Sequence, residues 1–238
     1  MMFVFKNRDV IAPSRKELLW GLLCWFAFMV GFPLLFGAMG IFAEDSLRAN
    51  FLYNLTVSVS SFALVLLVFR NFLFRSRLPF YMLLITCLFG FIANMGLESL
   101  NNILLALLYP FLQEDPTNLN QEAVNSFLNN YTGYMLLDVI LLAPIVEELL
   151  FRGTIFGPLC RRSPLWAYIV SIAAFATLHV VGSIGVQHWT VILFSFLQYL
   201  PGGFVLCWSY QRSQSIWAPI ALHGIMNLYS SIMILTLT

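Results

Sequence analysis

Six ionisable side chains occur within apolar stretches in the second half of the chain. They are Asp138, Glu147, Glu148, Arg152, His179 and His223. A charged group at the centre of a bilayer costs about 3 kcal/mol, so such residues are usually functional or paired. Carboxylates and imidazoles are also the usual general acids and bases of hydrolytic enzymes. The set therefore indicates proton-transfer chemistry inside a membrane.

The first group consists of two adjacent glutamates followed by an arginine. Helical spacing places Glu148 and Arg152 at i and i+4, where we expect an ion pair. Glu147 points about 100° away and has no partner at that spacing. A partly desolvated, unpaired carboxylate is suited to act as a general base. The alternative is a structural ion pair beside a solvated glutamate at the membrane edge.

The second group is a histidine, His179, four residues after Phe175. The basic turn at residues 161–164 predicts an antiparallel helical hairpin. Ser163 is 16 residues from both Glu147 and His179, which is roughly 24 Å along each helix. We therefore expect Glu147 and His179 to face each other. The alternative is a histidine that makes only a packing hydrogen bond.

The third group is His223 with Asn227, again at i and i+4. Two side-chain N–H donors on one helical stripe suit an oxyanion, although an interhelical hydrogen-bonded pair would show the same spacing. Pro219, one turn earlier, lacks a backbone N–H and could kink this helix. Asp138 either lines a water-filled access path or is an interfacial acid.

The elements that carry these groups must be membrane helices. The chain has 238 residues, of which 60% are hydrophobic and 10% charged, and its mean hydropathy is +0.85. Soluble domains carry about 25% charge, so a soluble enzyme is excluded. A net charge of +1 offers no basic surface, so we expect no nucleic-acid partner.

The apolar runs predict an all-α, polytopic transmembrane helical bundle of about seven spans. A shorter run at 101–112, interrupted by Pro110, is expected to be re-entrant or interfacial. The seven expected spans are Leu18–Ala43, Ala49–Phe69, Leu78–Leu97, Tyr131–Cys160, Pro164–Val186, Thr190–Tyr210 and Ser215–Leu237.

The distribution of basic residues predicts the orientation. With seven spans and a cytoplasmic N-terminus, only Arg48 lies outside, and the positive-inside rule is satisfied. The basic residues expected inside are Lys6, Arg8, Arg15, Lys16, Arg70, Arg75, Arg77, Arg161, Arg162 and Arg212.

The three groups together resemble the CPBP family of CAAX proteases and bacteriocin-processing enzymes, also called the Abi family of intramembrane proteases. Its motifs EExxxR, FxxxH and HxxxN/D correspond in order to Glu147-Glu148-Leu-Leu-Phe-Arg152, Phe175-Ala-Thr-Leu-His179 and His223-Gly-Ile-Met-Asn227. The resemblance covers residues 131–238 and implies a catalytic helical core there. Residues 1–130 are expected to form N-terminal transmembrane helices and an acidic extracytoplasmic loop of the same membrane domain.

The resemblance implies a role for each motif residue. Glu147 is the expected general base and His179 its partner on the attacking water. His223 and Asn227 are expected to stabilise the oxyanion. Glu148, Arg152 and Phe175 are expected to have structural roles. A cofactor is not favoured, although zinc held by Glu147, His179 and His223 is an alternative.

The leading functional hypothesis is an endopeptidase in the bacterial cytoplasmic membrane. It would cleave a membrane-associated peptide or a membrane-anchored protein at or near the cytoplasmic side, with membrane lipid as its surroundings. The alternatives are a non-catalytic protein, such as a bacteriocin self-immunity factor or a scaffold, and a proton-coupled transporter. The transporter is the weaker idea, since the sequence shows no inverted repeat.

Overall fold

A computed structural model describes residues 10–39, 46–112 and 116–237, and all regular structure within them is helical. The prediction of an all-α fold is therefore confirmed. Lys6 and Arg8, which contributed to the predicted orientation, lie outside the described residues.

Six helices or continuous helix pairs are long and apolar enough to cross a membrane. α3 (Leu47–Arg75) and α4 (Phe80–Leu108) are single long helices, and α11 (Trp217–Leu237) is the last. The other three are composite: α1 (Arg15–Phe26) with α2 (Phe32–Ala38), α8 (Pro164–Val180) with a 3-10 turn at Val181–Ser183, and α9 (Trp189–Gln198) with α10 (Leu200–Ser213).

The expected span at 131–160 forms a helical pass but is not among these six. It contains four charged residues, Asp138, Glu147, Glu148 and Arg152. The pass consists of α5 (Leu119–Leu137), the π-helix η3 (Asp138–Leu142), α6 (Ala143–Glu148), the π-helix η4 (Leu149–Phe156) and α7 (Gly157–Cys160). Six of the seven expected spans are thus helices long and apolar enough to cross a membrane. The seventh, α5 to α7, is called the polar pass below.

The prediction of a separate re-entrant element at 101–112 is wrong. α4 continues without a break to Leu108 and ends in a 3-10 turn at Tyr109–Phe111, where Pro110 lies. The polar residues Glu98 and Asn101, at the junction of the two expected runs, lie within the helix; Glu98 accepts from Asn94, and Asn101 donates to the carbonyl of Leu197. The terminator is Pro110.

Proline residues explain the π-helical segments. Pro33, Pro144 and Pro158 each follow such a segment by two positions. In η3, the N–H of Ala143 bonds to the carbonyl of Asp138, five residues back. The next nitrogen, that of Pro144, has no hydrogen to donate. The carbonyl of Val139 therefore lacks a backbone donor and is available to a side chain.

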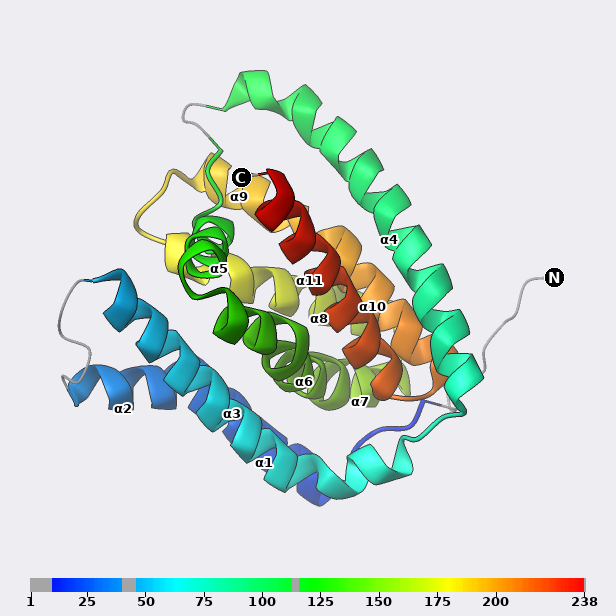
Figure 1. Ribbon diagram of the computed structural model, residues 1–238. Coiled ribbons are helices and arrows are strands. Elements are labelled where there is room, and N and C mark those ends of the chain that lie inside the picture. Colours follow the sequence, from blue (N-terminus) through cyan, green and yellow to red (C-terminus); the bar gives the residue numbers. More distant parts are fainter. Residues whose placement is uncertain (1–9, 40–45, 113–115, 238) are drawn as a thin grey trace.

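Successive passes run in opposite directions, so the helix ends gather at two ends of the bundle (Figure 1). At the first end, Arg75 pairs with Glu17 at 2.7 Å, and Arg161 donates to the carbonyl of Val10. We call this end the basic end, because the chain's described basic residues near helix termini, apart from Arg48, lie there: Arg15, Lys16, Arg75, Arg77, Arg161, Arg162 and Arg212.

The opposite end joins the start of α5 to the α8–α9 connection and to α9. Asn118 donates to Gln198, and Gln187 donates to the carbonyl of Thr117. We call it the far end.

The centre of the bundle is the polar pass. Leu149, Leu150, Phe151 and Phe156 of η4 are fully buried, and the Arg152 side chain is buried with them. The outer helices instead expose large apolar side chains such as Leu67 and Phe80, each 72% exposed. An apolar exterior around a core that holds charged groups is the arrangement of a protein in lipid.

Candidate active site

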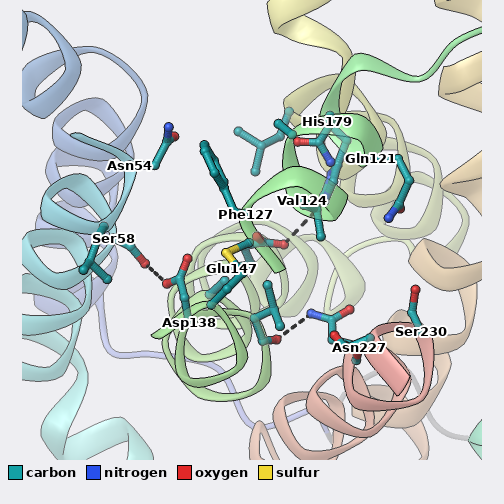
Figure 2. Close-up of a pocket in the computed structure, with 18 of the residues that line it drawn as sticks. Asn54, Ser58, Gln121, Val124, Phe127, Asp138, Glu147, His179, Asn227 and Ser230 are labelled. Atoms are coloured by element: carbon teal, nitrogen blue, oxygen red, sulfur yellow. Dashed lines mark hydrogen bonds and ion pairs between the residues drawn. The ribbon is translucent and has the colours of Figure 1, made fainter. Parts of the chain in front are cut away.

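Residues from both halves of the chain enclose a cavity of about 400 Å³. It lies between α3, the polar pass and α11, with the ends of α8 and α9 closing it (Figure 2). Glu147, His179, His223 and Asn227 all line it, so the structure brings the four predicted catalytic residues to one space. The apolar walls include Phe51, Phe127, Leu178 and Ile234.

The two residues expected to face each other do so. His179 Nε2 is 3.9 Å from Glu147 Oε2, and the two side chains are 15% and 13% exposed. This distance is too long for a hydrogen bond. Glu147 Oε2 is buried and makes no hydrogen bond to any described residue.

A backbone contact determines which nitrogen of the His179 ring carries the hydrogen. Nδ1 lies 2.8 Å from the carbonyl oxygen of Phe175. A carbonyl only accepts, so Nδ1 carries a proton and donates it. In the neutral ring Nε2 then has a free lone pair directed toward Glu147. A water between the two could donate one hydrogen to each and keep its own lone pairs for attack.

Glu148 forms a buried network instead of entering the cavity. Its Oε1 accepts from Arg152 Nη1 and lies 2.9 Å from His223 Nδ1, also at hydrogen-bond distance. Arg152 also donates to the carbonyl of Gly203 and lies over the Phe175 ring, 4.5 Å from its centroid. The ion pair expected from the i, i+4 spacing is present. It joins η4, α8, α10 and α11 and orients the His223 ring.

Asn227 has a partner that the sequence did not suggest. Its Nδ2 donates to the carbonyl of Val139, 2.7 Å away, the same carbonyl that the η3 turn leaves without a backbone donor. One amide N–H is therefore used to hold α11 against η3. The second N–H and the amide oxygen remain on a side chain that lines the cavity.

The structure adds residues that sequence reasoning missed. Tyr199 stacks on His179, and its hydroxyl accepts from Asn118 and Asn120. The one local signal was the Leu-Pro pair after Tyr199, which predicts a new helix there. Asp138, whose place was left open, lines the cavity and accepts a hydrogen bond from Ser58 of α3. The first half of the chain thus forms part of the wall.

The donor set does not fit a metal ion. Within the described ranges, no three histidine, cysteine, aspartate or glutamate side chains are grouped closely enough to hold one. The alternative zinc set of Glu147, His179 and His223 is not such a group. The mechanism proposed for this chain therefore uses protein groups and water.

The fold and the cavity define a class of protein, a helical membrane protein with a hydrolase-like polar site. Comparisons with known proteins agree with this class. Residues 129–229 match the family model described as type II CAAX prenyl endopeptidase Rce1-like. This part of the chain is a domain of the Rce1-like CAAX protease (CPBP/Abi) family. The resemblance drawn from the three motifs is confirmed.

Three curated relatives are similar to the chain. UPF0177 protein YbdI of Lactococcus lactis is 30% identical over 132 residues, 54% of this chain and 66% of that protein. "Putative membrane peptidase YdiL" of Bacillus subtilis is 32% identical over 94 residues, 39% of this chain and 34% of that protein. UPF0177 protein YbdJ of L. lactis is 25% identical over 196 residues, 81% of each chain. No solved structure matches.

Proposed function

We propose that the chain is an intramembrane endopeptidase that hydrolyses a peptide bond with a water activated by Glu147 and His179. The observation that carries this proposal is the spacing of the two side chains. Two acceptors 3.9 Å apart, one of them with its tautomer fixed by Phe175, can share the hydrogens of a single water. The cavity of about 400 Å³ is large enough for a short peptide segment.

The proposed reaction moves one proton through Glu147. The water oxygen attacks the carbonyl carbon, and Glu147 accepts a water proton while His179 Nε2 holds the other hydrogen. The tetrahedral intermediate then collapses, the C–N bond breaks, and Glu147 returns the proton to the leaving amine nitrogen. General base catalysis of this kind contributes about 10²- to 10⁴-fold to the rate.

The oxyanion would be stabilised from α11. His223 Nδ1 is held by Glu148, so a doubly protonated ring would present Nε2–H to the cavity. Asn227 retains a second amide N–H beside it. Donors fixed in a water-poor site are worth more than the same donors in water, because they need no reorganisation during the reaction.

The proposed substrate is a membrane-associated peptide or a membrane-anchored protein, and the proposed location is the bacterial cytoplasmic membrane with the N-terminus inside. Both proposals are supported by the family domain at residues 129–229 and by the six apolar helices. The charge distribution at the basic end supports the orientation.

Comparative proteomics of membranes that contain the wild type or Glu147→Ala tests this function. We expect intact precursors to accumulate with the variant. Glu98→Gln is a matched control, because Glu98 is a carboxylate on α4 that does not line the cavity. If Glu147→Ala is folded in the membrane, changes no precursor and keeps the parent's phenotype, the non-catalytic immunity or scaffold hypothesis replaces the peptidase.

A further inference from the structure

The cavity extends from the middle of the bundle toward the far end. Its lining includes Asn120 and Gln121 in the first turn of α5 and Ser230 in the second half of α11, all toward the far end. On α8 it is lined by Leu178 and His179, next to the helix end at Val180. None of the described arginines or lysines lines it.

The distance from the basic end is large compared with the membrane. Along the regular helix α8, His179 is 16 residues from Ser163 in the basic turn, roughly 24 Å at 1.5 Å per residue, and Glu147 lies beside it. The hydrocarbon core of a bilayer is about 30 Å thick. His179, and Glu147 beside it, therefore lie past the middle of the bilayer, on the side of the far end.

Charge assigns the two ends to the two sides of the membrane. Basic residues concentrate on the cytoplasmic side of short loops, and the basic end has Arg75, Arg77, Arg161 and Arg162 in two such loops. The far end has Arg48 alone among the described basic residues. The basic end is therefore assigned to the cytoplasm, and the cavity to the other half of the bilayer.

We propose that the substrate enters the cavity from the extracytoplasmic side. Asn54, Asn120 and Ser230 are exposed residues of the lining. Their amides and hydroxyl can bond to the backbone of an extended peptide, while the apolar wall deeper inside contacts its side chains. An opening lined by uncharged polar groups suits a segment that has already crossed the membrane.

The proposal rests on the proposed peptidase function and narrows its substrates. They are exported peptides, or the outward-facing segments of anchored proteins close to the membrane surface. A prenylated C-terminus in the cytoplasm would be separated from Glu147 by most of the bilayer. A cytoplasmic N-terminus and cleavage near the cytoplasmic side, both expected from the sequence, are therefore incompatible in this geometry.

Labelling of single introduced cysteines by a membrane-impermeant maleimide tests directly on which side of the membrane the cavity opens. The four native cysteines are buried, so background labelling is low. Ser230→Cys reports on the cavity, and Ser163→Cys, the same substitution at the basic turn, is its control. We expect Ser230→Cys to be labelled as fully in intact spheroplasts as after permeabilisation, and Ser163→Cys to be labelled only after permeabilisation.

The reverse pattern, or a Ser230→Cys that is not labelled in intact spheroplasts, overturns the proposal. Asn120→Cys serves as a second reporter if Ser230→Cys does not fold. Labelling does not depend on catalysis. If it follows the expected pattern while Glu147→Ala accumulates no precursor, the peptidase function fails and the assignment of the side stands. If precursors accumulate, their cleavage sites must lie in extracytoplasmic segments, and cytoplasmic sites would contradict the proposal.

Discussion

Tyr199 stacks on His179 with ring centroids 4.3 Å apart and planes inclined by 30°. The hydroxyl of Tyr199 is held in turn by Asn118 and Asn120, each at 3.1 Å. The ring of His179 is thus fixed on one side by Tyr199 and at Nδ1 by the carbonyl of Phe175. A catalytic imidazole whose orientation is fixed from two directions loses less entropy in reaching the reactive geometry.

This contact predicts different effects for two Tyr199 variants. Tyr199→Phe keeps the stacked ring, so we expect a cleavage rate within about threefold of wild type. Tyr199→Leu loses the stack, which is worth about 1 kcal/mol, and we expect a loss of about five- to tenfold in kcat. Rates are measured on a precursor identified by proteomics, with thermal unfolding in detergent as the control for structure. A wild-type kcat for Tyr199→Leu would show that the stack does not position His179.

The buried ion pair predicts a large loss of stability. Arg152 is 0% exposed, and its removal leaves the carboxylate of Glu148 buried without its cation. We expect Arg152→Met to cost about 3–5 kcal/mol. Arg75→Met is the matched control, because Arg75 also pairs with a glutamate but is 51% exposed, and we expect it to cost less than about 1 kcal/mol. Equal unfolding midpoints for the two variants in detergent would refute the prediction.

The approach of α11 to η3 predicts that Gly224 cannot be replaced. A Cβ at Gly224 would lie 2.6 Å from the carbonyl oxygen of Ile140, whereas one at Gly96 would meet nothing within 4 Å. We expect Gly224→Ala to destabilise the protein by about 1–3 kcal/mol and to displace Asn227 from Val139. Gly96→Ala, also in a helix, is expected to be neutral or slightly stabilising. Thermal unfolding checks both, and an unaffected Gly224→Ala would contradict the close packing.

Metal independence is a further prediction. Because the described donors do not gather three ligands, we expect a tight chelator to leave the cleavage rate of the purified protein unchanged. The rate is measured before and after prolonged chelation and again after addition of zinc. A loss that zinc restores would favour the zinc set of Glu147, His179 and His223 over the metal-free mechanism.

Much of the fold and part of the site follow from local patterns. Apolar length predicts the helices, and the basic turn at 161–164 predicts the hairpin that brings Glu147 opposite His179. These properties depend on residues close in sequence or on helix rise alone. The i, i+4 spacing likewise predicts the Glu148–Arg152 pair, because one helix determines that geometry.

Other features depend on packing between distant segments and have no local pattern. The stacking of Tyr199 on His179 joins the end of α9 to the end of α8. The bond from Asn227 to Val139 depends on the π-helical register of η3. Pro144 is its sequence signal, but a proline alone does not tell which carbonyl becomes free. The contribution of Ser58 from α3 could not be predicted, since nothing in the first half of the sequence indicates its neighbour.

The central claim is that Glu147 and His179 act on one water, and a double-mutant cycle on cleavage tests it most directly. The rate at which new N-termini appear is measured for wild type, Glu147→Gln, His179→Ala and the double variant. Each single change is expected to lower the rate at least about 100-fold. The double variant should be no slower than the slower single variant, because residues that act as a unit are not additive. If the loss in the double variant equalled the product of the two single losses, or if either single variant kept full activity, the shared water would be contradicted.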